Sequence, residues 1–155
     1  MEAISIQAAD FDAGVELAQL RAASRETGAI ASFVGVVSES NDDRRVQRLR
    51  LEHYPGMTER AIAAIIAEAR ERWPLLAVRV IHRVGELDLR EQIVFVGVAS
   101  RHRGAAFEAC EFIMDFLKTR APFWKKESTT DGEHWVAARK SDDAAAERWR
   151  APDQS

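Results

Sequence analysis

The sequence lacks the residues that build disulfide frameworks and multi-cysteine metal sites, because Cys110 is the only cysteine among its 155 residues. A single cysteine excludes an internal disulfide and a zinc site made of several thiolates. No apolar run approaches the roughly 20 residues that cross a bilayer. The N-terminal segment carries Glu2 and Asp10 and does not have the basic and then apolar pattern of a leader. We therefore expect a cytoplasmic protein.

A large excess of one charge is also missing. The chain has 22 basic and 25 acidic residues and a net charge of -3, which argues against general nucleic-acid binding but leaves room for a local basic pocket. Its 46% hydrophobic and 30% charged content is typical of a globular domain. The sequence predicts one domain over residues 1–140, followed by a polar, alanine-rich tail over 141–155.

Alternation and helical spacing predict a mixed order of strands and helices. Residues 38–45 are polar throughout and predict an exposed loop, while the strand after them departs from strict alternation once and predicts a bulge. A hairpin is predicted at 77–99 around Gly85. The expected strands are 3–7, 29–37, 46–53, 77–84, 92–99, 123–127 and 134–137, and the expected helices are 12–24, 57–73 and 104–120. This order is that of an α+β protein with a largely antiparallel sheet and packed helices.

The start of the helix at 104–120 is the first candidate site. His102 and Arg103 precede unpaired backbone N–H groups and the positive end of the helix dipole, a combination that favours an anion. Arg103 adds a planar fork suited to phosphate. The alternative is a solvated basic turn.

On the predicted inner side of the same helix are Phe107, Cys110, Ile113, Met114 and Leu117.

A second candidate site follows at the other end of this helix. Pro122, Phe123 and Trp124 form a stiff corner between Lys118 and Lys125. If the two lysines share a partly dry pocket, each lowers the pKa of the other; kept protonated, they stabilise an oxyanion on an acyl group under attack. The alternative is a helix-terminal cation and a lysine on the surface of a strand.

Other reactive side chains have simpler explanations. Cys110 lies at helical spacing between Phe107 and Met114, which favours a core position over a nucleophile. The four histidines share no short metal-ligand spacing, and there is no phosphate loop, dinucleotide glycine pattern or nucleophile elbow. We expect no metal and no cofactor.

Several short motifs occur in order between about Gly28 and Arg139. They are Phe33-Val34-Gly35, Leu51-Glu52-His53-Tyr54-Pro55-Gly56-Met57, His82-Arg83-Val84-Gly85, His102-Arg103, Phe112-Ile113-Met114-Asp115 and Ala121-Pro122-Phe123-Trp124-Lys125-Lys126-Glu127. Together they closely resemble the large, catalytic subunit of molybdopterin synthase. The resemblance covers most of the chain.

The resemblance implies an α+β hammerhead-type fold and a homodimer at the centre of a heterotetramer. Each end would bind a small ubiquitin-like sulfur carrier, whose C-terminal Gly-Gly thiocarboxylate enters a pocket of this subunit. The implied reaction inserts two sulfurs, from two carriers in turn, into cyclic pyranopterin monophosphate and so forms molybdopterin. Neither nucleic acid nor membrane is an implied partner.

The resemblance also implies roles for particular residues. Lys118 and Lys125 match the family's catalytic lysines. The matching substrate residues are His102, Arg103, Arg139, Lys126, Glu127, Val36, Val37 and Ser38. Ser38 departs from the pattern, because the family usually has arginine there, so that a phosphate or pterin contact is missing or comes from Arg44 or Arg45.

Two expectations remain to be tested. If Gly104 to Lys118 is one helix, a rise of about 1.5 Å per residue separates its ends by about 20 Å, so one chain cannot bring His102 and Lys118 to one small substrate. A composite pocket between two-fold mates follows as a hypothesis. The alternative function is a diverged, non-catalytic module that binds a phosphorylated pterin or the C-terminus of a partner.

Overall fold

The computed structural model describes residues 2–41, 44–136 and 140–150, which contain four helices and nine strands. The helices are α1 (Ala13–Ala22), α2 (Met57–Arg72), α3 (Arg103–Thr119) and α4 (Lys140–Glu147). The strands are β1 (Ile4–Gln7), β2 (Ala29–Val36), β3 (Ser40–Asn41), β4 (Arg44–His53), β5 (Leu75–Arg83), β6 (Gly85–Asp88), β7 (Gln92–Ser100), β8 (Phe123–Thr129) and β9 (Gly132–Val136). The α+β class expected from the sequence is confirmed.

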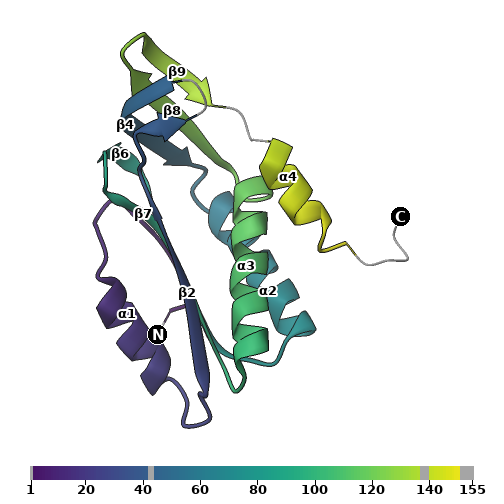
Figure 1. Cartoon of the computed structure of the whole chain (residues 1–155). Coiled ribbons are helices and arrows are strands. Elements are labelled where there is room, and N and C mark those ends of the chain that lie inside the picture. The colour runs from purple at the N-terminus through teal and green to yellow at the C-terminus, as the bar shows by residue number, and fades with distance from the viewer. Residues whose placement is uncertain (1, 42–43, 137–139, 151–155) are drawn as a thin grey trace.

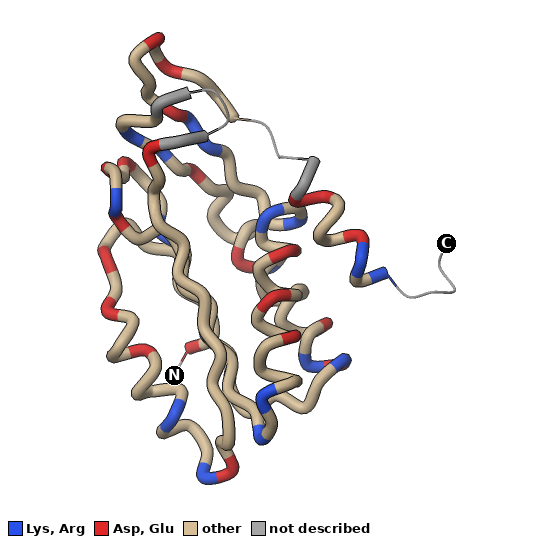
Figure 2. The backbone as a smooth tube through the Cα atoms, in the orientation of Figure 1, with Lys and Arg blue, Asp and Glu red and all other residues tan. Residues whose placement is uncertain are grey.

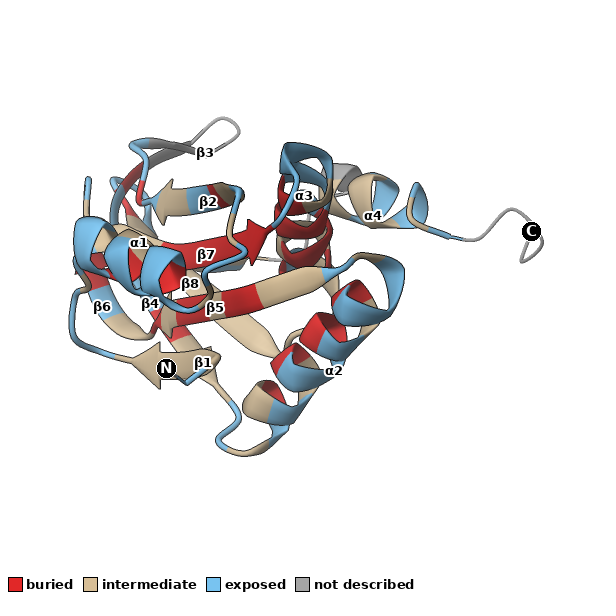
Figure 3. Cartoon of the chain, turned by 90° about the horizontal axis from the view of Figure 1, so that it is seen from below, coloured by how far each residue is buried: buried red, intermediate tan, exposed pale blue. Residues whose placement is uncertain are grey.

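The larger sheet has the strand order β1-β5-β7-β2 and is covered on both faces (Figure 1). Helix α1 lies on one face, and α2 and α3 lie on the other. Strands β5 and β7 pair antiparallel, as the sequence predicted, and β1 adds to β5 in parallel. Because both faces are covered, the central strands are nearly continuous in apolar residues and are buried (Figure 3).

Alternate residues of β7 build two different cores. Val94, Val96 and Val98 face the buried sides of α2 and α3, whereas Phe95 and Ala99 pack with Leu20 of α1. Gly97 lies in the row that faces α1, and a Cβ atom there would come within 2.4 Å of a Leu20 methyl group. The glycine therefore permits the close approach of α1 to the sheet.

The smaller sheet has the order β3-β4-β8-β9, with β6 paired to β4. The predicted bulge is present, because the register of β4 against β8 shifts between Val46 and Arg48. The expected loop at 38–45 is wrong in part, since β3 forms a short pair with the start of β4. The turn expected at Gly85 contains instead the strand β6, which leaves the hairpin and joins the other sheet. Its short length hid it from periodicity.

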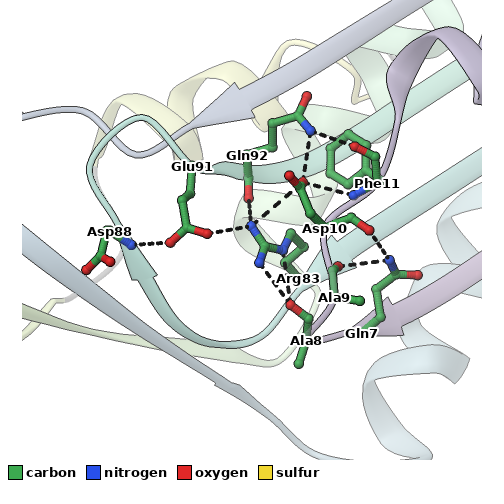
Figure 4. A network of polar contacts seen from close by, with 9 residues as sticks. All are labelled: Gln7, Ala8, Ala9, Asp10, Phe11, Arg83, Asp88, Glu91 and Gln92. Carbon is green, nitrogen blue, oxygen red and sulfur yellow. Dashed lines mark hydrogen bonds and ion pairs between the residues drawn. The ribbon is translucent and has the colours of Figure 1, made fainter.

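A buried arginine ties the N-terminal segment to the end of β5 (Figure 4). Arg83 donates to the carbonyl oxygens of Ala8, at 3.0 Å, and Gln92, at 2.9 Å. It also pairs with Glu91 at 3.4 Å and Asp10 at 3.8 Å. The Gln92 amide donates to Asp10 and is the main cause that lowers the pKa of that carboxyl. Every oxygen around the guanidinium therefore has a donor, which stabilises a buried charge.

Two contacts fix the corner between α3 and β8. The Thr58 hydroxyl, at the start of α2, accepts from the N–H of Tyr54 and donates to the carbonyl of Pro122, each at 3.0 Å. His82 of β5 stacks on Phe123 with ring centroids 3.8 Å apart and 17° between the planes, and its Nδ1 lies 2.9 Å from the Arg83 carbonyl oxygen. These contacts join the two sheets where the corner begins.

Two further expectations differ from the structure. Phe107, expected on the buried side of α3, is 65% exposed, because the inner stripe of the helix runs through Ala106, Ala109 and Cys110 instead. The expected tail begins with the helix α4, and Ala146 and Trp149 pack against the main core. Its polar composition concealed these two apolar contacts.

Thr58→Val should lower the free energy of unfolding by about 1–2 kcal/mol, because it leaves a partly buried N–H and a partly buried carbonyl without the Thr58 hydroxyl. Thr58→Ser keeps the hydroxyl and should cost about 1 kcal/mol for the lost methyl group. Urea unfolding measures both. Equal losses in the two variants would show that the methyl group, and not the hydroxyl bridge, holds the corner.

His82 should make stability depend on pH. Burial, with smaller contributions from the charges of Lys118 and His53, lowers its pKa from 6.5 to about 4. Between these values the unfolded chain binds a proton that the folded chain does not, so stability should fall by about 2–3 kcal/mol as the pH drops from 6.5 to 4. His82→Gln should flatten this loss in urea titrations, while His102→Gln, at an exposed position, should leave it unchanged. An unaltered slope in His82→Gln would contradict the assignment.

Candidate functional site

A pocket of about 320 Å³ lies between the inner face of the smaller sheet and the C-terminal end of α3. Leu49 and Leu51 of β4 form part of its apolar lining. The charged and polar groups in its lining are Ser38, His82, Lys118, Lys125, Glu127 and Asp142. Residues from eight elements and from the junctions between them therefore meet in one cavity.

The two candidate lysines share this pocket. Lys118 lies in the last turn of α3 and is exposed, while Lys125 is the third residue of β8 and has a side chain 32% exposed. The turn at Ala121 and Pro122 reverses the chain between them. Because β8 alternates, Lys125 and Glu127 both face the pocket. Figure 2 shows basic positions at both ends of α3.

Glu127 is the most buried charged group of the pocket, with a side chain only 2% exposed. Its Oε1 lies 3.8 Å from Nζ of Lys125. Across the sheet it is paired in register with His134, whose Nε2 is buried without a hydrogen-bond partner within the described part of the chain. A buried carboxylate therefore lies within ion-pair distance of Lys125 and restricts its side chain.

Two pocket residues were not singled out from the sequence as site residues. His82 faces both this pocket and an adjoining one of about 290 Å³, and its low pKa keeps the imidazole neutral at neutral pH. Asp142 reaches the rim from α4. The position of His82 at the end of an alternating strand was a usable signal, but no local pattern linked Asp142 to the two lysines of the site.

The segment after β2 also reaches the site. Val36, Val37 and Ser38 line the main pocket, and Val36 continues into the adjoining one. Val37 is buried, and its carbonyl accepts from the N–H of Arg90 at 2.9 Å, which fixes the backbone here. Ser38 therefore occupies a pocket position.

Other expected site residues lie elsewhere. His102 and Arg103 are exposed at the opposite end of α3, about 22 Å along the helix from Lys118. Lys126 points to the outer face of the smaller sheet, where it pairs with Glu133 at 2.9 Å and lies over the Trp135 ring. Arg139 lies outside the described residues. The described part of one chain thus brings together Lys118, Lys125, Glu127 and residues 36–38. His102, Arg103 and Lys126 lie outside this group.

The pocket chemistry is that of charge stabilisation. Two primary amines, a buried carboxylate and a neutral imidazole can bind an anion and stabilise an oxyanion. Burial raises the pKa of Cys110 to about 12, so its thiol is not a nucleophile here. In the described residues, no group of three or more His, Cys, Asp or Glu side chains could hold a metal ion. None of the described helices is both long and apolar enough to span a membrane.

Comparison with known proteins identifies the family. The family model described as MoaE protein matches residues 6–120. The molybdopterin synthase catalytic subunit of Pseudomonas aeruginosa is 58% identical over 147 residues, which are 95% of this chain and 98% of that protein. The molybdopterin biosynthesis MoaE protein of Burkholderia ambifaria has a TM-score of 0.82 and 54% identity, with 96% of this chain and 98% of that chain covered. Molybdopterin synthase of Staphylococcus aureus has a TM-score of 0.81 and 29% identity, with 88% and 98% covered. The resemblance expected from the motifs is confirmed, and the chain belongs to the MoaE protein family, the catalytic subunits of molybdopterin synthase.

Proposed function

We propose that this chain converts cyclic pyranopterin monophosphate to molybdopterin by inserting two sulfurs. The observation that carries the proposal is the meeting of Lys118 and Lys125 in one pocket, with Glu127 beside the second lysine. Sulfur has to come from outside this site, because the only cysteine is buried in the core and its thiol stays protonated. A partner that carries the sulfur satisfies this requirement.

The proposed partner is a small ubiquitin-like protein that ends in a Gly-Gly thiocarboxylate. An extended tail of two glycines is narrow enough to enter a pocket of this size. Its sulfur forms a bond to a substrate carbon as the bond from that carbon to an oxygen substituent breaks and the leaving oxygen takes a proton. Water then breaks the bond between that sulfur and the carrier's acyl carbon. The carrier leaves as a carboxylate, and a second carrier repeats the step. The proposed assembly is a homodimer of this chain with a carrier at each end.

In this mechanism the two ammonium groups act on the carrier's acyl group. Lys118 and Lys125 stabilise the oxyanion that forms when water attacks the acyl carbon. Glu127 holds the Lys125 side chain in place. His102 and Arg103 supply donors for the cyclic phosphate, and residues 36–38 and Arg139 complete the proposed set of substrate residues. Lys126 is left out of this set, because it points to the outer face of its sheet. Ser38 lines the pocket in the position where the family usually has arginine.

The same proposal assigns the reaction to the cytoplasm and to a single domain over residues 1–140, against which the segment of α4 packs and contributes Asp142 to the pocket. A free thiol at Cys110 is compatible with a reducing compartment. The alternative is a binding module without turnover, which the serine at position 38 favours. A single-turnover reaction of cyclic pyranopterin monophosphate with thiocarboxylated carrier distinguishes the two, because only an enzyme forms the dithiolene.

Lys118→Ala should reduce dithiolene formation at least 100-fold, and Lys125→Ala should impair it severely, because each removes an oxyanion-stabilising charge. Carrier binding, measured by calorimetry, should change little. Arg21→Ala removes a basic side chain from α1, outside the pocket, and serves as the control. Full activity in Lys118→Ala would reject the catalytic assignment.

A composite site should show complementation between variants. His102 and Lys118 lie at opposite ends of α3, so a substrate that needs both requires two chains. Mixing inactive Lys118→Ala and His102→Ala proteins should restore part of the activity once subunits exchange, because heterodimers contain one intact site. Mass spectrometry confirms the exchange. No recovery with exchanged subunits would reject the shared pocket.

A further inference from the structure

The C-terminal helix is anchored to the outer side of α3 by a tryptophan. Nε1 of Trp149 donates to Oδ2 of Asp115 at 2.6 Å, and Arg148 donates to the same oxygen at 2.9 Å. The Trp149 ring packs edge to face on Trp73 and Phe112, with centroids 5.6 and 5.5 Å away. An indole that satisfies both its ring and its N–H is a strong local anchor.

The same face of the C-terminal segment carries Asp142. Residues 142, 146 and 149 follow the spacing of one helical face, and the N–H of Trp149 still bonds to the carbonyl of Ala146 at 3.1 Å. Ala146 and Trp149 pack on the core, and Asp142 lines the pocket. Figure 1 shows α4 beginning near the C-terminal end of α3, where the pocket lies. The helical face that carries Asp142 is therefore the face that Ala146 and Trp149 hold against the core.

A carboxylate is unexpected in a pocket built to bind anions. Lys118 and Lys125 attract any small anion that diffuses in, including free phosphate. Glu127 is buried and lies beside Lys125, so it offsets that charge only in part. A second carboxylate at the rim lowers the affinity for small anions that make no other contact. A large ligand that contacts other walls of the pocket tolerates this repulsion.

We propose that Asp142 is a specificity-determining residue that keeps free small anions out of the lysine pocket, and that Trp149 is the positioning residue that holds it there. The inference rests on the proposed function of this pocket. It concerns the selection of the ligand and not the sulfur transfer itself.

Binding of inorganic phosphate tests the inference without turnover. Asp142→Asn should bind phosphate about fivefold more tightly by calorimetry, since one repulsive unit charge a few ångströms away in water contributes about 1 kcal/mol. Asp143→Asn is the matched control, because it makes the same charge change in the same helical turn but lies outside the pocket lining. Its phosphate affinity should stay within twofold of the unaltered chain. Equal changes in the two variants, or none in Asp142→Asn, would overturn the proposal.

The anchor is tested in the same assay. Trp149→Ala should tighten phosphate binding as Asp142→Asn does, and the double variant should not exceed either single one. Trp149→Phe keeps an aromatic ring but loses the bond to Asp115. Its phosphate affinity should lie between those of the unaltered chain and Trp149→Ala, which keeps the test valid if the alanine variant unfolds. Arg150→Ala changes a residue whose ion pair stays within the C-terminal segment and is the control. Additive effects of Asp142→Asn with Trp149→Phe would overturn the role of the anchor.

The catalytic assay separates this inference from the proposed function. With carrier and pterin substrate, phosphate should inhibit Asp142→Asn more strongly than the unaltered chain, each compared with its own rate in the absence of phosphate. If the unaltered chain shows no sulfur transfer but the phosphate affinities shift as expected, the proposed reaction is wrong, while the role of Asp142 in excluding small anions is supported. If transfer occurs and the phosphate affinity of Asp142→Asn equals that of the unaltered chain, only the role of Asp142 in excluding small anions is wrong.

Discussion

The corner between α3 and β8 is the constraint on which the site depends. The Thr58 hydroxyl bridges α2 to Pro122, and His82 stacks on Phe123 at 3.8 Å, so the chain must reverse at one place and in one direction. Without this reversal, the chain after Lys118 would continue along the axis of α3, and Lys125 would not share a pocket with Lys118. Buried hydrogen bonds are well suited to this task, because an unpaired buried group costs more than a bond contributes.

Electrostatics in the pocket are balanced and not simply basic. Glu127 is almost fully buried beside Lys125, the imidazole of His82 is kept neutral by burial, and Asp142 stands at the rim. This mixture of charges fits a catalytic pocket, since the relatives are catalytic subunits of molybdopterin synthase. An enzyme that acts on an acyl group needs cations beside the oxyanion that forms, and weak binding of other anions in the same pocket.

Much of the architecture follows from local patterns. The run of valines in β7 and the periodic isoleucines of α2 predict their elements, because burial on both faces leaves a continuous apolar run and burial of one stripe leaves a helical period. The short strand β6 and the helix α4 escaped, since four residues carry no period and an alanine-rich polar segment resembles a tail. Phe107 is exposed although its spacing predicted burial, because periodicity gives a face and not its limits.

The sequence alone determined the α+β class, the family motifs and the two lysines on either side of a proline–aromatic corner. Only the tertiary structure decided which charges meet. It turned Lys126 to the outer face of its sheet, brought His82 and Asp142 to the lysine pocket from distant segments, and left His102 and Arg103 at the far end of α3. The physical reason is that spacing along a chain fixes the face of an element, whereas the meeting of two elements depends on packing across the whole core.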